Sequence, residues 1–327
     1  MKTRVALIAG GDSGEYEVSI NSAASVYKQL DKELYEVYTI YMEKTDWFYE
    51  DSVHGKMQVD KNDFSINLEA GKITFDVAFI LIHGTPGEDG KLQGYFELLG
   101  IPYTTSDLFT STITFKKSFT KHVARSLDIP ISKTIFLEQS DSKSPKELIN
   151  EVGLPCFVKP NKGGSSVGIT KVKREEDLQT AINKAFEEDD EVLVEEFIEG
   201  TEVDCGMYME NGEIIPLPLT EIVPKTEFFD YEAKYLGASD EITPARINNE
   251  KTKRCQELSV LLYKEFNCKG LVRFDYILKD DTFYFLEVNT IPGLSAASIV
   301  PQQIRYMGKT ETAVYGELIE DALRRKR

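Results

Sequence analysis

Cysteine and histidine are both scarce in this chain of 327 residues. Its four cysteines include no CxxC pair and are too few for the disulfide framework of a small secreted protein. Its three histidines form no HExxH zinc motif. We therefore expect reduced, buried thiols in a cytoplasmic protein.

Long apolar runs are also missing. The N-terminal run, residues 5–9, is too short for the core of a signal peptide. Nothing approaches the roughly 20 apolar residues of a membrane-spanning helix. The sequence thus predicts a protein with no membrane partner.

Basic residues are the minority charge. There are 38 Lys and Arg against 55 Asp and Glu, which gives a formal charge of −17. Such a field repels polyanions, which argues against nucleic acid or an anionic membrane as the main target. A smaller anionic ligand would need a few cations gathered at one place, and we expect a locally positive cleft.

What is present suits a folded α/β protein of two or three domains, with 41% hydrophobic and 28% charged residues. Residues 5–9, 36–41 and 77–82 have the pattern of strands, and residues 18–30 have helical spacing. This β-α-β opening predicts a parallel sheet with functional loops at the strand ends. Residues 101–104 fit its last edge.

The middle of the chain predicts a second α+β unit. A helix is expected at residues 114–127, stopped before Pro130. Strands at 133–137, 156–160 and 192–197 alternate with helices at 145–151 and 175–187.

The last third contains a strand-like segment at 204–220 and a stretch rich in turn formers at 224–245. We interpret that stretch as a long ordered loop or lid. A helix follows at 251–266, then strands at 271–279 and 282–289 and closing helices. The basic end, residues 324–327, predicts either a partner signal or cations completing a helix.

Two features suit a nucleotide. Lys159 ends a predicted strand, and the glycines and hydroxyls of residues 163–168 follow it. Such a loop can wrap its N–H groups around a phosphate, although a plain Gly/Ser turn is the alternative. The strand at 192–197 ends in Glu195 and Glu196 and can present backbone groups to an adenine edge, with Glu202 near the ribose.

A metal site is predicted where two strands pair. Asp275 shares a strand face with Arg273, and Glu287 shares one with Asn289. If the connecting loop has three residues, Asp275 faces Glu287 and Arg273 faces Asn289. A two-residue loop would place them on opposite faces. Two carboxylates and an amide oxygen suit Mg²⁺, and we expect Phe283 and Phe285 to share the same half-buried face.

Six short blocks then occur in order and carry a family resemblance. They are GGDSGEYEVS (10–19), HGTPGEDG (83–90), GSSVG (164–168), YEAKY (231–235), RFD (273–275) and EVNTIPG (287–293). With them, the chain resembles the D-alanine–D-alanine ligases of the ATP-grasp superfamily over essentially its whole length. The implied fold is an α/β (α+β) ATP-grasp fold with an N-terminal parallel α/β domain. The implied domains are residues 1–105, 106–197 and 198–327.

The resemblance also implies a role for each matched residue. For the amino-acid substrates these are Glu15 at the first D-alanine ammonium with His83 nearby, Ser165 and Tyr235 locking the lid, Arg273 and the Gly293 N–H as oxyanion hole, and Ser298 at the second carboxylate. For the nucleotide these are Lys117, Lys159, Ser166 and Lys234 at the phosphates, Glu195, Glu196, Phe197 and Ile198 as the adenine hinge, and Glu202 at the ribose. Asp275, Glu287 and Asn289 would hold two Mg²⁺, with Mn²⁺ as a substitute.

The implied reaction joins two D-alanines with ATP, through a D-alanyl phosphate, for peptidoglycan synthesis. Tyr235 favours D-alanine as second substrate, because relatives that use D-lactate usually lack it. Two departures are Phe115-Lys116-Lys117, where many members have Met-Asp-Lys, and Phe197, where tryptophan is also known. The partners expected are small molecules and a second copy of the chain.

Two alternatives stay open at this point. One is an ATP-grasp ligase that uses D-lactate or D-serine as second substrate. The other is a nucleotide-binding module without catalysis, against which the intact Arg273, Asp275, Glu287 and Asn289 argue.

Overall fold

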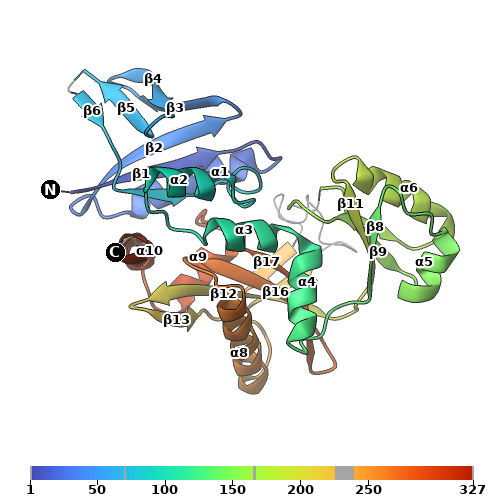
Figure 1. The fold of residues 1–327 in the computed structure, drawn as a ribbon. Helices are drawn as coiled ribbons and strands as arrows, with labels where there is room; N and C mark the ends of the chain where they lie inside the picture. Colours follow the sequence, from blue (N-terminus) through green and yellow to red (C-terminus); the bar gives the residue numbers. More distant parts are fainter. Residues whose placement is uncertain (1, 70, 165–166, 225–238, 326–327) are drawn as a thin grey trace.

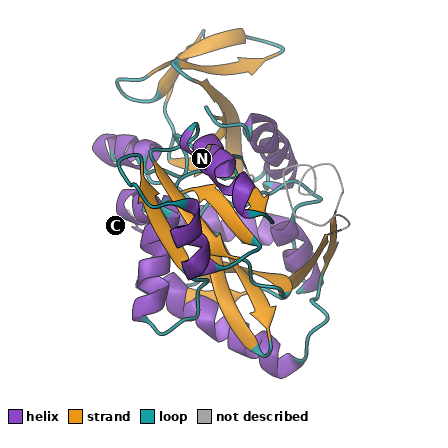
Figure 2. Cartoon of the chain, turned by 90° about the vertical axis from the view of Figure 1, so that its right-hand side faces the viewer, coloured by secondary structure: helices purple, strands orange, loops and turns teal. Residues whose placement is uncertain are grey.

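The computed structural model describes residues 2–69, 71–164, 167–224 and 239–325. Four predicted site residues, Ser165, Ser166, Lys234 and Tyr235, lie outside this part, as does most of the predicted lid. Within the described residues the strands form three sheets, which are flanked by helices (Figures 1 and 2).

The N-terminal sheet has the strand order β6-β5-β4-β3-β2-β1-β7. Its strands are β1 (Thr3–Gly10), β2 (Tyr35–Glu43), β3 (Asp46–Asp51), β4 (Gly55–Asp60), β5 (Ser65–Leu68), β6 (Gly71–Ile73) and β7 (Val77–Ile80). β1 pairs in parallel with β2 and β7, and α1 (Tyr16–Gln29) connects β1 to β2. The predicted parallel opening is confirmed, and Tyr103 adds a parallel bridge at its edge.

The four strands β3 to β6 extend this sheet in antiparallel fashion and were not predicted. They are short, and most of their side chains are half-buried or exposed, so apolar alternation along them is weak. The helix α2 (Lys91–Leu99) was missed as well.

The apolar run of β1 is buried because both faces of the sheet are covered. Val5 and Leu7 pack with α1 and with α10 (Glu311–Arg325). Ala6 and Ile8 pack on the other face, with an aromatic group that includes Phe96. The last helix of the chain thus covers the first sheet, which ties the two ends of the chain together (Figure 1).

The middle sheet has the order β10-β9-β11-β8 and stands apart on the right of Figure 1. Its strands are β8 (Thr134–Glu138), β9 (Cys156–Pro160), β10 (Thr170–Val172) and β11 (Glu191–Glu196). α5 (Pro145–Val152) and α6 (Glu175–Phe186) pack against it through one apolar cluster. Ser144 caps α5 in a capping box with Glu147. These elements confirm the predicted second α+β unit.

The third sheet has the order β15-β14-β12-β16-β17, with β13 paired to β12. Its strands are β12 (Thr201–Glu210), β13 (Glu213–Pro216), β14 (Thr220–Pro224), β15 (Ser239–Ile242), β16 (Val272–Lys279) and β17 (Thr282–Asn289). α8 (Asn249–Glu265) packs against this sheet. The prediction of a loop throughout 224–245 is wrong for β15, because residues 239–242 pair with β14.

The single helix predicted at 114–127 is also wrong, since two helices occupy this region. α3 (Leu108–Phe115) ends before Lys116, which has extended backbone angles, and α4 (Lys117–Ser126) begins after it. The break has a long-range cause. The Lys117 N–H donates to the Asn161 carbonyl at 3.0 Å, and the Ser118 N–H donates to the Asn161 side chain at 2.8 Å. Asn161 therefore caps α4 from the middle sheet.

The basic end of α10 contacts the protein itself. Arg325 donates to the carbonyls of Tyr103 and Thr105, and Arg324 pairs with Glu317 on its own helix. Both arginines lie in the last turn of α10, where one of the two predictions puts them, whereas residues 326–327 lie outside the described part of the chain. None of the helices in the described ranges has the length and apolar character needed to cross a bilayer.

Candidate active site

The β16–β17 hairpin brings the predicted metal ligands together by an unexpected route. Asp275 pairs with Glu287 and Arg273 pairs with Asn289, as predicted. The assumed loop length of three residues is wrong, because Lys279 pairs with Thr282 across a two-residue turn. A β-bulge next to Asp275 restores the pairing, since one extra residue on a strand shifts its register by one.

The bulge also reverses part of the face assignment. Phe283 and Phe285 are buried in the apolar core behind the hairpin, together with Phe274. The expectation that they share a face with the two acids is wrong. The acids therefore stand on the site side of the sheet, and the aromatic rings support it from behind.

Arg273 is the centre of the polar face. Its guanidinium donates to both Asp275 oxygens, at 2.7 and 2.8 Å, and lies 3.3 Å from Asp204 on the neighbouring strand β12. Burial disfavours its charge, but Asp275 and Asp204 outweigh this effect and hold the pKa of Arg273 well above its usual value. Asn289 also donates to Asp275, at 2.8 Å.

Asp204 was not predicted as a site residue. The signal available was an acid between two apolar residues of a strand, Val203 and Cys205, which are buried on the other face. Its position opposite Asp275 follows from the β12–β16 pairing, which joins residues far apart in the chain.

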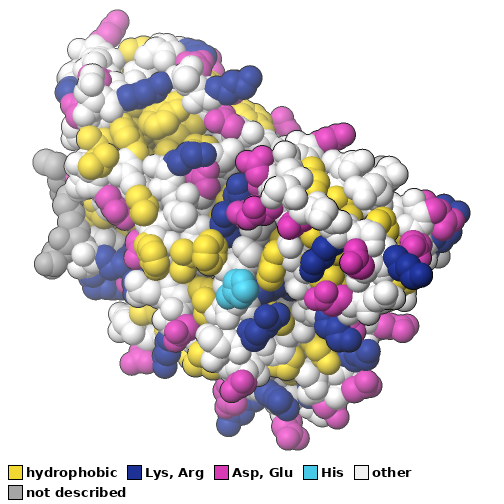
Figure 3. Space-filling view, turned by 45° about the vertical axis from the view of Figure 1, so that its right-hand side comes forward, with side chains coloured by type: hydrophobic (Ala, Val, Ile, Leu, Met, Phe, Trp, Pro, Cys, Tyr) yellow, Lys and Arg dark blue, Asp and Glu magenta, His cyan; other side chains and the backbone are white. Residues whose placement is uncertain are grey.

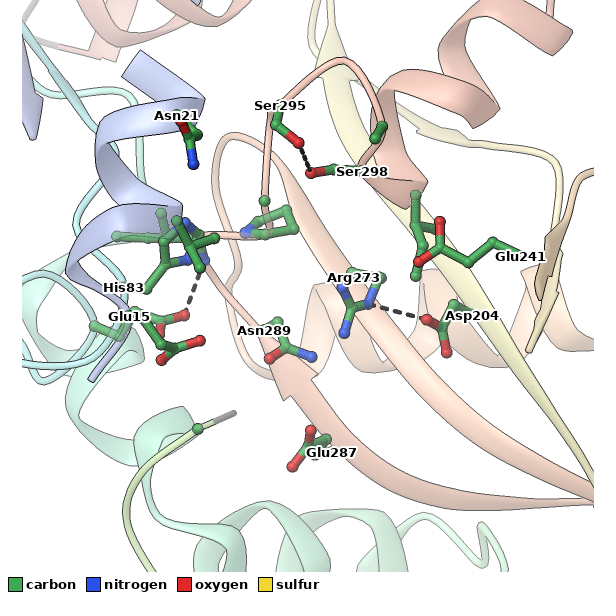
Figure 4. Close-up of a pocket in the computed structure, with 18 of the residues that line it drawn as sticks. Glu15, Asn21, His83, Asp204, Glu241, Arg273, Glu287, Asn289, Ser295 and Ser298 are labelled. Carbon is green, nitrogen blue, oxygen red and sulfur yellow. Dashed lines mark hydrogen bonds and ion pairs between the residues drawn. The ribbon is translucent and has the colours of Figure 1, made fainter. Parts of the chain in front are cut away.

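A cavity of about 310 Å³ opens in front of this face (Figure 4). It brings together the predicted residues Glu15, His83, Glu202, Arg273, Glu287, Asn289, Gly293 and Ser298. It adds residues that were not predicted, among them Asn21, Glu88, Asp204, Glu241 and Ser295. Figure 4 shows Glu15 and His83 on one side and Arg273 and Asp204 on the other, with Asn289 between them.

The charge of the cavity differs from the expected positive cleft. Its described lining includes Glu15, Glu88, Glu202, Asp204, Glu241 and Glu287, whereas Arg273 is the one lysine or arginine there. On the face in Figure 3, acidic and basic side chains are interspersed. The described part of the cavity is therefore suited to cations, such as an ammonium group or a metal ion, as well as to the anion that Arg273 can meet.

Glu15 stands where the Gly-rich loop meets the N-terminal unit. It immediately precedes α1, and a Cβ added to Gly164 would lie 2.8 Å from its Oε2. Any side chain at position 164 would therefore push against the Glu15 carboxylate. The same contact brings the predicted phosphate loop to the edge of the cavity.

His83 is buried at the same end of the cavity. Burial lowers its pKa, against the opposing effect of Glu15, and its ring is hydrogen-bonded to the Ile291 backbone. The lowered pKa favours a neutral imidazole at neutral pH. His83 is thus placed to orient the loop that leads to Gly293.

Glu88 holds the same loop from its other side. Its carboxylate accepts hydrogen bonds from the Gly84 N–H at 2.9 Å and from the Ile291 N–H at 3.1 Å. Burial, reinforced by the charge of Glu15, raises the pKa of Glu88 to about 8. Sequence reasoning matched the block 83–90 as a whole but assigned only His83 within it.

Ser298 and Gly293 are neighbours at the far wall of the cavity. Ser298 occupies the N-cap position of α9 (Ile299–Tyr306) without capping it, and its hydroxyl lies 2.8 Å from the Ser295 hydroxyl. A Cβ on Gly293 would lie 3.0 Å from the Ser298 Oγ. A serine at this position often caps a helix through its hydroxyl, but the Ser298 hydroxyl makes no such hydrogen bond. Its hydroxyl is directed to the cavity wall instead (Figure 4).

Lys117 lies beside the cavity, in a small adjoining space of about 30 Å³ that shares Gly164, Glu287 and Asn289 with it. Its ammonium donates to the Gly163 carbonyl at 2.7 Å and lies 3.5 Å from Glu287. The structure therefore brings Lys117 to both the Gly-rich loop and the metal hairpin.

Lys159 and Glu195 pair with each other, away from the main cavity. The Lys159 ammonium lies 2.6 Å from one Glu195 oxygen, and the ammonium of Lys121 lies 3.0 Å from the other. Burial alone would raise the pKa of Glu195, but the two lysines outweigh it and lower that pKa to about 2. Lys121 was not predicted, since a lysine on a helix normally reaches solvent.

The rest of the predicted hinge continues from Glu195 at the end of β11. The Glu196 N–H donates to the Lys133 carbonyl at 2.9 Å. The Phe197 ring packs near Phe157 and lies 3.7 Å under the Lys171 ammonium. The hinge role of residues 195–198 stays a prediction.

Comparison with known proteins identifies the family. The family model described as D-ala D-ala ligase N-terminus matches residues 4–106, and that described as D-ala D-ala ligase C-terminus matches residues 123–320. A D-alanine--D-alanine ligase of Christiangramia forsetii is 45% identical over 100% of both chains. One of Bacteroides fragilis is 45% identical over 98% of this chain and 99% of its own.

Solved structures agree with this result. The VanG D-Ala:D-Ser ligase of Enterococcus faecalis has a TM-score of 0.88 and 32% identity, covering 98% of this chain and 100% of its own. The D-alanine--D-alanine ligase of Bacillus anthracis complexed with ATP has a TM-score of 0.79 and 30% identity, covering 99% and 98%. The α/β ATP-grasp fold expected from the sequence is thereby confirmed. The chain belongs to the D-alanine–D-alanine ligase family.

Proposed function

We propose that this protein joins two molecules of D-alanine to D-alanyl-D-alanine with ATP, as a step of peptidoglycan precursor synthesis. The observation that carries the proposal is that Glu15, Arg273, Gly293 and Ser298 line the same cavity. These are the groups an acyl-transfer reaction on an amino acid requires: an anion for the ammonium, donors for an oxyanion, and a hydroxyl for a second carboxylate.

The chemistry proceeds in two steps. A D-alanine carboxylate oxygen attacks the γ-phosphorus of ATP, which gives D-alanyl phosphate and ADP. The amine of the second D-alanine then attacks the acyl carbon. The tetrahedral oxyanion collapses, inorganic phosphate leaves, and the amine nitrogen loses a proton.

The proposed role of each residue follows its place. Glu15 holds the first ammonium with neutral His83 beside it, and Arg273 and the Gly293 N–H donate to the oxyanion. Ser298 donates to the carboxylate of the second D-alanine. By family resemblance, Ser165 and Tyr235 close over the first substrate and Lys234 reaches the transferred phosphoryl group.

At the nucleotide end, we propose that Lys117, Lys159 and Ser166 contact the phosphates. Residues 195–198 form the adenine hinge, and Glu202 binds the ribose. Lys117 has the firmest support, because its ammonium lies between the Gly163 carbonyl and Glu287. Phe197 offers an aromatic ring at the hinge in place of tryptophan.

Asp275, Glu287 and Asn289 fit Mg²⁺ by their chemistry. Mg²⁺ takes oxygen ligands and is usually held by one or two carboxylates with substrate phosphates completing its shell. Among the described residues no three His, Cys, Asp or Glu side chains form a metal-binding group, so phosphate oxygens would have to complete the site. Bound there, two Mg²⁺ (or Mn²⁺) would neutralise charge on the transferred phosphoryl group.

We further propose domains at residues 1–105, 106–197 and 198–327, with α10 packed back on the first. A homodimer is proposed from the family, and the exposed Leu98 of α2 and Phe109 of α3 offer apolar surface for it. Sedimentation of the purified protein tests the dimer. A cytoplasmic location is proposed because the reaction consumes ATP.

D-Serine remains a second candidate for the nucleophile, because a D-Ala:D-Ser ligase is among the similar structures. The test is the purified protein with ATP, Mg²⁺ and D-alanine, alone and with D-serine or D-lactate, with products identified by mass spectrometry. D-Alanyl-D-alanine as main product supports the proposal. An excess of D-alanyl-D-serine or D-alanyl-D-lactate favours a ligase with that second substrate. ATP binding without turnover of any D-amino acid supports a non-catalytic module.

A further inference from the structure

Lys121 is a charged side chain with no exposed surface. It lies on α4 four residues after Lys117, so the two lysines project from the same helix face. The Lys121 ammonium contacts Glu195 at 3.0 Å and donates to the Ser132 hydroxyl at 3.2 Å. Because it is closed off from solvent, this ammonium cannot itself touch a ligand.

Glu195 is thereby held by two cations, one at each oxygen. Lys159 contacts Oε2 at 2.6 Å, and Lys121 contacts Oε1. Thr134 adds a hydrogen bond to Oε1 at 3.3 Å. The three charged groups together carry one surplus positive charge.

If Lys159 were the only cation at Glu195, it could not leave Glu195 to contact a phosphate. Turning the Lys159 ammonium toward a phosphate would leave the buried Glu195 carboxylate without a cation, which is strongly unfavourable. With Lys121 in place, the carboxylate keeps a partner after Lys159 leaves. The second lysine therefore makes the first one available.

We infer that Lys121 is a positioning residue, which holds Glu195 so that Lys159 can turn to the phosphates of ATP. The inference rests on the proposed function in one respect, namely that Lys159 contacts phosphate. Lys159 is near the Gly-rich loop, because it is the second-last residue of β9 and the loop begins at Gly163. Lys117, on the same face of α4, contacts the Gly163 carbonyl of that loop.

The test uses K121M and K121R in the full chain. ATP affinity is measured by calorimetry without D-alanine, and KM and kcat by initial rates. K121M is expected to weaken ATP binding at least about tenfold, with kcat and the KM for D-alanine within about threefold. K121R restores most of the affinity. Adenosine, which has no phosphate, binds wild type and K121M alike.

A matched control is available in Lys116. Its ammonium lies 2.9 Å from Glu191, on the strand that also carries Glu195, and Lys116 directly precedes α4, but this pair is partly exposed. K116M is expected to leave ATP affinity unchanged.

Three results would overturn the inference. They are K121M with wild-type ATP affinity and only a lower melting temperature, equal losses for ATP and adenosine, and no rescue by K121R. If K121M fails to fold, E195Q and E195Q/K121M are compared instead. Equal ATP affinity of these two variants supports action through Glu195, and a further loss in the double variant contradicts it. Wild-type protein without ATP turnover would instead refute the proposed function.

Discussion

Glu88 and Ile291 are 203 positions apart in the sequence, yet the Glu88 carboxylate accepts a 3.1 Å hydrogen bond from the Ile291 N–H. The loop after Ile291 carries Gly293, whose N–H is proposed for the oxyanion hole. We expect E88A, which removes the hydrogen bonds to the Gly84 and Ile291 N–H groups, to lower kcat by about 10- to 100-fold, because small displacements of a catalytic group are costly. Initial rates measure kcat. An unchanged kcat would show that Glu88 does not position the oxyanion hole.

The same residue predicts a pH dependence of stability. Folding raises the pKa of Glu88 from its ordinary value of 4.5 to about 8. Its protonated form is thus favoured in the folded state, and the stability it contributes is complete below pH 4.5 and lost as the pH rises through 8. Melting temperatures from pH 5 to 8.5 should fall less steeply for E88Q than for wild type. Parallel curves would contradict the raised pKa.

Arg273 should tolerate no replacement. R273K keeps the charge but loses the planar fork that contacts Asp275 and Asp204, and kcat should fall about 10²- to 10³-fold. R273A should also destabilise the fold, by about 3–5 kcal/mol, because it leaves two buried carboxylates without their cation. Urea unfolding measures the second effect. A wild-type kcat for R273K would show that Arg273 does not act in the oxyanion hole.

Ser298 and Ser295 form a matched pair, since their hydroxyls are 2.8 Å apart on the same loop. S298A should raise KM for the second D-alanine about tenfold, as expected when a hydrogen bond to a charged group is lost. S295A should change it less than about threefold. If S295A has the larger effect, the carboxylate contact belongs to Ser295.

Glu287 should control the metal requirement. E287Q removes one proposed carboxylate ligand, so half-maximal activity should need at least about tenfold more Mg²⁺. D281N is the control, because Asp281 lies at the turn of the same hairpin and pairs with Lys251. An unchanged Mg²⁺ titration for E287Q would place the metal elsewhere.

Local patterns predicted the parts of this fold that local sequence determines. The buried strand β1, its parallel partner β2 and the helices α5 and α6 follow from apolar periodicity and caps. The family resemblance named eight of the residues that line the cavity, among them Glu15, Arg273 and Ser298. What local patterns could not predict depends on distant pairing.

The break at Lys116 needs Asn161, and the register of Asp275 needs a bulge on the opposite strand. Glu88, Lys121 and Asp204 look like surface charges in sequence. Each became a site residue only because a partner from another part of the chain faces it.

In the proposed reaction, a D-alanine carboxylate is activated in the cavity as an acyl phosphate. The most direct measurement uses D-alanine with both carboxylate oxygens replaced by ¹⁸O, together with ATP and Mg²⁺. We predict D-alanyl-D-alanine and one ¹⁸O atom in each inorganic phosphate released, because a carboxylate oxygen leaves with the phosphoryl group. Absence of the dipeptide, or phosphate without ¹⁸O, would contradict it.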